Sequence, residues 1–260
     1  MRGGPAPAAA DLARGPWLRL VTADGDDGTP LLDARERHRA AALRRPADRA
    51  LYIAVHAELR RALGAVLGTA PHAVELVRLA CPGCGGPHGR PAVAGPAGAA
   101  VHFSLSHGDG LALLALASAP VGVDIERVPA ARTAADAAEA LHPAERAELA
   151  RLPADGRPAA FARCWTRKEA YLKATGEGLS GTALHARYLG CGPRPAPVAG
   201  WTLTDVPAPL GWAAACAVRG PGAGAGVIRG GGASCARPPG PGTTYRTTAR
   251  RRTRGTAPPR

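Results

Sequence analysis

Residues 121–128, VGVDIERV, alternate apolar and charged side chains, and this pattern restricts the fold more than any other stretch of the chain. Side chains of a β-strand point alternately to its two faces, so Asp124 and Glu126 would share one face while Val123 and Ile125 face a core. Two carboxylates this close repel each other, and a divalent cation between them removes the conflict. Oxygen ligands favour Mg²⁺. The alternative is an edge strand that exposes two solvated acids.

A predicted helix over residues 158–175 carries both lysines of the chain, Lys168 and Lys173; every other basic residue is arginine. Glu169 lies at the edge of the apolar face that contains Trp165, so it would point toward neighbouring structure. Three acids and two lysines suit a metal-bound pyrophosphate, in which the acids hold the ion and the ammonium groups neutralise phosphoryl oxygens. The alternative is an ordinary amphipathic helix with a Glu–Lys pair one turn apart.

Three further groups of residues carry possible chemistry. Ser106 and His107 follow a predicted strand over residues 101–105. A hydrolase nucleophile with its base is disfavoured there, because adjacent strand residues point to opposite faces, and we expect phosphate contacts instead. Arg90 is a candidate phosphate contact beside Pro91. Cys81, Cys84 and His88 have part of the spacing of a zinc site, but a fourth ligand is missing from the motif, and a turn with thiols is the plainer interpretation.

The order of predicted elements indicates an α+β fold. A strand, a long amphipathic helix and further strands occur before residue 119, and the same order recurs after residue 120, which indicates two similar α/β halves. We expect a flexible N-terminus (1–15), an N-terminal α/β half (16–119), a C-terminal α/β half with the metal and phosphate motifs (120–220) and a disordered basic tail (221–260). The expected elements are strands at 17–21, 75–80, 101–105, 111–117, 121–128, 183–189, 201–206 and 212–218, and helices at 50–67, 133–152 with a break at Pro143, and 158–175.

Charge and hydropathy narrow the class of protein. The net charge is +13, but residues 221–260 contain eight arginines and no acid, so the rest of the chain carries only +5. Nucleic-acid binding through the tail is therefore an alternative and not the main interpretation. The sequence has neither an apolar run of about 18 residues nor the apolar core of a signal peptide. We expect a cytoplasmic protein without a membrane span.

In combination these motifs resemble the 4′-phosphopantetheinyl transferase superfamily, of the type that activates nonribosomal peptide and polyketide synthases. Two blocks carry the resemblance most specifically: GVDIE at 122–126, and W-x-x-K-E-x-x-x-K at 165–173. A weaker block, FSLSH at 103–107, lies just upstream. The likeness extends from about residue 35 to about residue 218. Members of the family generally end soon after the last strand, which sets the basic tail apart.

The resemblance implies a fold and a set of site residues. The fold would be a pseudo-dimer of the two α/β halves, each a small antiparallel sheet with a long helix, with coenzyme A and Mg²⁺ in the cleft between them. Asp124, Glu126 and Glu169 match metal ligands, and Glu169 and Lys173 match catalytic residues. The positions implied for coenzyme A contacts are Arg37, Arg49, Arg90, Ser106, His107, Lys168 and Lys173, with arginine in place of the family's lysine at position 90.

The implied reaction is Mg²⁺-dependent transfer of the 4′-phosphopantetheine group from coenzyme A to a serine of an acyl or peptidyl carrier protein. Glu169 would accept the serine proton, directly or through water. The expected partners are carrier-protein domains of antibiotic and other secondary-metabolite biosynthesis, and the expected state is a monomer. The alternatives are a non-catalytic relative that binds coenzyme A or carrier protein, and a basic nucleic-acid-binding protein.

Overall fold

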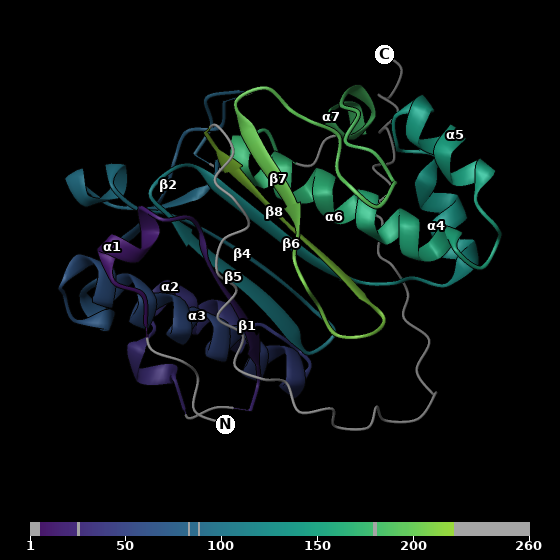
Figure 1. Cartoon of the computed structure of the whole chain (residues 1–260). Helices are drawn as coiled ribbons and strands as arrows, with labels where there is room; N and C mark the ends of the chain where they lie inside the picture. The colour runs from purple at the N-terminus through teal and green to yellow at the C-terminus, as the bar shows by residue number, and fades with distance from the viewer. Residues whose placement is uncertain (1–5, 25–26, 83, 88, 179–180, 221–260) are drawn as a thin grey trace, which may run out of the picture.

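The computed structural model describes residues 6–24, 27–82, 84–87, 89–178 and 181–220. The tail expected to be disordered, 221–260, lies outside the described residues. Two three-stranded antiparallel sheets form the centre of the molecule, and each is covered by one long helix (Figure 1). The structure therefore has the mixed α+β character that the sequence predicts.

The N-terminal half consists of a sheet with the strand order β1-β5-β4 and the helix α3 (Pro46–Leu67). Proline at the first helical position has its φ angle already set for a helix. The helix ends at Gly68, whose φ of 65° is the left-handed conformation that glycine adopts without strain. The strands are β1 (Trp17–Thr22), β4 (His102–Gly108) and β5 (Leu111–Ala117), and the smaller elements are α1 (Ala9–Leu12), η1 (Thr29–Leu31), α2 (Ala34–Ala41), η2 (Pro71–Ala73), β2 (Leu76–Arg78), β3 (Pro91–Val93) and η3 (Pro96–Ala99).

The C-terminal half repeats this order of strands. Its sheet runs β6-β8-β7, so in both halves the third strand of the sheet in sequence lies between the first and the second. Along the sequence, the long helix α6 (Arg157–Thr175) lies between the first strand of the sheet and the other two, as α3 does in the N-terminal half. The strands are β6 (Val121–Arg127), β7 (Trp201–Asp205) and β8 (Trp212–Arg219), and the other helices are α4 (Ala131–Ala138), α5 (Pro143–Arg151) and α7 (Gly181–Ala186). The term pseudo-dimer implies that the two halves are structurally related repeats, and this relationship stays a prediction.

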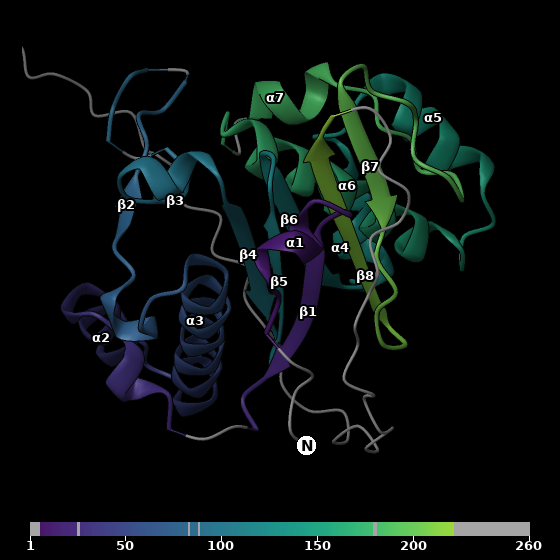
Figure 2. The same ribbon diagram turned by 60° about the vertical axis from the view of Figure 1, so that its left-hand side comes forward.

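The elements stack in four layers, from α3 through the two sheets to α6 (Figure 2). Alternate residues of β5 divide between two cores: Leu114 and Leu116 pack under α3, whereas Leu113 faces the second sheet. In the same way Val123 of β6 faces the first sheet, while Ala215 and Ala217 of β8 pack against α6. The face of β6 that points away from the first sheet is therefore the face that meets α6.

The sequence predicts most elements correctly and one wrongly. Residues 183–189, predicted as a strand, are helical to residue 186 and irregular beyond it. The stretch ALHARYL contains no β-branched residue and is rich in helix-forming alanine and leucine, which accounts for the error. The break at Pro143 is confirmed, because α5 begins at this proline. Within the segment expected to be a flexible N-terminus, α1 places Leu12 in the core of the N-terminal half.

Among the helices of the described segments, none is both long and apolar enough to cross a bilayer.

Candidate active site

The site forms where β6 crosses α6 without an intervening side chain. A Cβ atom at Gly122 would collide with the main chain of Ala170 and of Ala174 on α6, so only glycine permits this approach. Asp124 and Glu126 follow Gly122 on the same face of the strand. This close contact brings the strand's two acids to the helix that carries Glu169.

Asp124, Glu126 and Glu169 form one acidic cluster, as the sequence predicts for its three candidate metal ligands. One carboxylate oxygen from each residue lies within 4.8 Å of the others. Asp124 is fully buried, and Glu169 is 8% exposed. The Oδ2 atom of Asp124 is buried and has no hydrogen-bond partner among the described residues. Since burying an unsatisfied carboxylate oxygen is costly, this atom fits a site for a cation.

Burial and charge repulsion within the cluster raise the pKa values of its two glutamates. Burial, followed by the charges of Asp124 and Glu169, raises the pKa of Glu126 to about 7. Burial, followed by the charge of Asp124, also raises the pKa of Glu169. A divalent cation would offset both effects because it adds positive charge at the centre of the repulsion. The residues present therefore fit a bound Mg²⁺.

Lys173 reaches this cluster from the next turn of α6. Its Nζ atom lies 2.6 Å from Asp124 Oδ1 and 3.6 Å from Glu169 Oε2. The same ammonium donates a hydrogen bond of 3.1 Å to the hydroxyl of Ser106. The side chain of Lys173 remains 28% exposed, so its charge can also reach an anionic ligand.

Glu169 is held by a hydrogen bond that the sequence analysis missed. The indole Nε1 of Trp165 donates to Glu169 Oε1 at 2.8 Å. The two residues are four apart on the helix, the spacing at which side chains meet, so the signal was present in the sequence. Trp165 therefore restricts the orientation of the carboxylate while the other oxygen stays on the side of Lys173.

The structure corrects the expectation for Lys168, whose side chain does not join the acidic cluster. Its ammonium is fully buried, lies 2.8 Å from Glu145 Oε2 and donates to the carbonyl oxygens of Leu184, at 2.7 Å, and Arg187. Successive helical residues are about 100° apart, so Lys168 and Glu169 face different neighbours. Lys168 therefore joins α6 to α5, to α7 and to Arg187 just after α7, and these contacts occupy its ammonium group.

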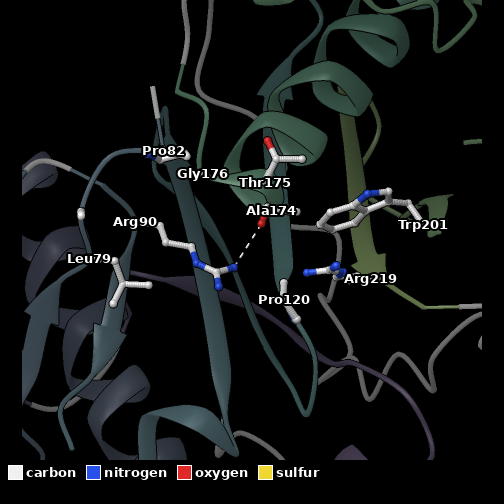
Figure 3. Close-up of a pocket in the computed structure, with 10 residues that line it drawn as sticks. Leu79, Pro82, Arg90, Pro120, Ala174, Thr175, Gly176, Trp201 and Arg219 are labelled. Atoms are coloured by element: carbon white, nitrogen blue, oxygen red, sulfur yellow. Dashed lines mark hydrogen bonds between the residues drawn. The ribbon is translucent and has the colours of Figure 1, made fainter. Parts of the chain in front are cut away.

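Arg90 lies apart from the cluster, in a pocket of about 230 Å³ between the two halves (Figure 3). Its guanidinium donates to the carbonyl oxygen of Ala174 at 3.1 Å. Arg219 enters the same pocket from the opposite side, next to Trp201, and none of the lining residues is acidic. Burial and then the charge of Arg219 lower the pKa of Arg90. The pocket is consistent with an anionic ligand, and neither Ser106 nor an acid of the cluster lines it.

His107 points from β4 toward the helices of the N-terminal half. Desolvation, followed by the charges of His56 and Lys173, lowers the pKa of His107. The His56 ring stacks on Tyr52 with a centroid separation of 4.0 Å and contacts Glu36 Oε1 through Nδ1 at 2.9 Å. His107 is exposed and follows buried Ser106 on β4, so the two side chains point to opposite faces of the strand, and the contact of His107 with phosphate stays a prediction.

Arg37 and Arg49 bond to nearby main chain. Arg37 donates to the carbonyl oxygen of Leu32, and Arg49 donates to that of Leu43 at 2.9 Å. Both side chains are exposed on the N-terminal half, and their predicted contact with coenzyme A stays a prediction. His88, one of the three zinc candidates, lies outside the described residues.

Comparison with known sequences supports the resemblance over part of the chain. The sequence model of the 4′-phosphopantetheinyl transferase superfamily matches residues 120–192, the segment that contains β6, α6 and all three clustered acids. This segment belongs to the 4′-phosphopantetheinyl transferase superfamily. The family recognised from the sequence motifs is thereby confirmed for residues 120–192.

Curated relatives of this superfamily match over longer or shorter parts of the chain. A Synechocystis protein named for 4′-phosphopantetheinyl transferase activity, slr0495, is 29% identical over 58% of the chain and 59% of its own length. The 4′-phosphopantetheinyl transferase HetI of Nostoc is 33% identical over 57% of the chain and 61% of its own length. The transferase psf-1 of Bacillus pumilus is 40% identical over 30% of the chain and 34% of its own length. The chain thus spans about three fifths of the first two relatives.

Proposed function

We propose that this chain transfers the 4′-phosphopantetheine group from coenzyme A to a serine of an acyl or peptidyl carrier protein. The observation that carries the proposal is the convergence of Asp124, Glu126 and Glu169 with Lys173, within the segment that matches the superfamily. Three acids and an ammonium at one point suit a reaction at a phosphate more than they suit simple binding.

The acidic cluster would hold Mg²⁺ through Asp124, Glu126 and Glu169. When bound, the ion would neutralise charge on the pyrophosphate of coenzyme A. The buried, unpartnered Oδ2 atom of Asp124 and the raised pKa values of the two glutamates support this assignment. Mg²⁺ dependence is part of the proposal.

The protein's own groups account for the remaining chemistry. The serine oxygen of the carrier forms a bond to the β-phosphorus, and the bond from that phosphorus to the bridging oxygen breaks, which releases 3′,5′-adenosine bisphosphate. Glu169 accepts the serine proton, directly or through a water molecule. Lys173 neutralises charge on the phosphoryl oxygens as the leaving group departs.

The partner would be an acidic carrier-protein surface. The chain without residues 221–260 carries a net charge of +5, which favours encounter with an acidic partner. We propose carriers of polyketide or nonribosomal peptide synthesis, within secondary metabolism. A cytoplasmic location and a monomeric state belong to the same proposal.

A mass-shift assay tests the function. The protein is incubated with Mg²⁺, coenzyme A and a panel of apo carrier proteins, and each carrier is weighed. We expect the gain of one phosphopantetheine group, and loss of this gain by at least about a hundredfold in Asp124→Ala and in Glu169→Ala, since each acts in the transition state. Asp136→Ala serves as the control because this exposed carboxylate on α4 lies outside the cluster.

Three results would count against the proposal. No gain of mass on any carrier, with coenzyme A bound, would support the non-catalytic relative instead. Turnover at the wild-type rate in Asp124→Ala or Glu169→Ala would refute the roles given to these acids. Binding of nucleic acid that is lost when residues 221–260 are removed would favour the basic binding protein.

A further inference from the structure

The hydroxyl group of Ser106 lies between Asp124 and Lys173. Its Oγ atom donates to Asp124 Oδ1 at 2.7 Å and accepts from Lys173 Nζ at 3.1 Å. The direction is fixed, because an ammonium can only donate and a carboxylate can only accept. Ser106 is 7% exposed, so these contacts occur largely away from water.

The two carboxylate oxygens of Asp124 have different surroundings. Oδ1 receives hydrogen bonds from Ser106, at 2.7 Å, and from Lys173, at 2.6 Å. Oδ2 is buried without a partner among the described residues. A carboxylate fixed at one oxygen cannot rotate freely, so the other oxygen keeps a constant position. The arrangement leaves Oδ2 as the atom available to a cation.

Two serines attach β4 to β6, and only one of them touches the acidic cluster. Ser104 and Ser106 are two residues apart on β4, and each is 7% exposed. The Oγ atom of Ser104 accepts a hydrogen bond from the main-chain nitrogen of Val123 at 3.1 Å. Ser104 therefore contacts the backbone of β6, whereas Ser106 contacts the Asp124 side chain.

We propose that Ser106 is a positioning residue that orients Asp124 for a divalent cation and places Lys173 beside it. This role differs from the phosphate contact that the resemblance implies for Ser106. The inference rests on the proposed function, since it needs Asp124 to be a metal ligand. It predicts an effect on metal binding before coenzyme A is present.

The test measures Mn²⁺ binding to the full-length protein without coenzyme A, by electron paramagnetic resonance of the free ion. Ser106→Ala is expected to raise the dissociation constant for Mn²⁺ about tenfold or more, the usual effect of removing a group that orients a metal ligand. Ser104→Ala is the matched control, because it removes a hydroxyl from the same strand at the same exposure. It should leave the dissociation constant within about twofold of wild type.

A second pair of variants separates positioning from folding. Ser106→Thr keeps the hydroxyl, and Ser106→Val replaces it with a methyl group of nearly the same shape. Mn²⁺ should bind Ser106→Thr more tightly than Ser106→Val by about tenfold, even if Ser106→Ala is unstable. In the mass-shift assay, raising the Mg²⁺ concentration should restore turnover in Ser106→Val, because the lost property is metal affinity.

The outcomes that overturn the proposal are distinct from those that overturn the function. Equal Mn²⁺ affinity in wild type and in the Ala and Val variants would refute the positioning role while leaving the transferase proposal intact. Equal weakening by Ser104→Ala would assign the effect to general loosening of β4. Absence of Mn²⁺ binding in the wild type would refute the metal site itself, and the inference with it.

Discussion

Glu126 occupies the more open end of the acidic cluster, and its protonation should be coupled to metal binding. In the metal-free protein its pKa is raised from 4.5 to about 7, by burial first and then by Asp124 and Glu169. A carboxyl group must lose its proton before it can bind a cation. Near neutral pH, metal and proton therefore compete for this residue.

We expect metal affinity to weaken as the pH falls from 8 to 6. The change should be at most about tenfold per pH unit, because binding of the metal displaces at most one proton from Glu126. The stability of the metal-free protein should change in the opposite sense. Because the folded-state pKa of Glu126 is raised, its stabilising effect is complete below about pH 4.5 and is lost as the pH rises through about 7. Calorimetric titration with Mn²⁺ and thermal melts at each pH check both trends.

Glu126→Gln is the control for this pH dependence, since glutamine does not ionise. Its melting temperature in the absence of metal should exceed that of the wild type increasingly as the pH rises from 6 to 8. If the melting temperatures of the wild type and of Glu126→Gln change in parallel with pH, the carboxyl group of Glu126 ionises outside the range from pH 6 to 8.

At the scale of elements, two adjacent faces of α6 make different contacts. Lys173 faces the acidic cluster that contains Glu169, whereas Arg167 and Lys168 bind α7 and the segment after it. Arg167 pairs with both oxygens of Asp205, at 2.7 and 2.6 Å, and Glu145 accepts from the main-chain nitrogen of Leu189 at 2.7 Å. The only two lysines of the chain thus have different surroundings: Lys168 is buried against Glu145, and Lys173 lies beside Asp124 in the acidic cluster.

Lys168→Ala is expected to destabilise the protein by about 3–5 kcal/mol, because it leaves Glu145 buried without its counter-charge. Lys173→Ala should lower turnover strongly and should cost less stability than Lys168→Ala, since the Lys173 side chain is partly exposed although its partner Asp124 is buried. Urea denaturation and the mass-shift assay measure the two effects. A stable Lys168→Ala protein with weakened coenzyme A binding would restore the phosphate role of Lys168.

Sequence periodicity predicted the strand with Asp124 and Glu126 and the helix with Glu169, because each signal lies within one element. The buried ion pair of Lys168 could not be predicted, since its partner Glu145 lies in a separate helix and is brought near only by tertiary packing. The contact between Ser106 and Asp124 was missed for the same reason: it joins strands of two different sheets.

At the scale of the whole molecule, one core joins the two halves. Side chains from both sheets form it, including Leu113 of β5 with Val123 and Ile125 of β6. A half on its own would expose this apolar surface to water. The two halves should therefore unfold together and not as independent domains.

Leu113→Ala should destabilise both halves at once, by about 2–5 kcal/mol, because it leaves a cavity in the shared core. Differential scanning calorimetry should show one transition in the wild type and one, at lower temperature, in the variant. Leu210→Ala is the control, since Leu210 is fully exposed at the turn before β8. Two separate transitions in either protein would mean that the halves fold independently.

The direct contact of β6 with α6 at Gly122 has a consequence for which ions the protein can select. Because main chain meets main chain there, the gap between the strand with two acids and the helix with the third is set by the backbone and not by adaptable side chains. A bulkier residue at position 122 would act as a spacer and widen that gap. The selection of an ion by its radius would thus depend on a residue that supplies no ligand at all.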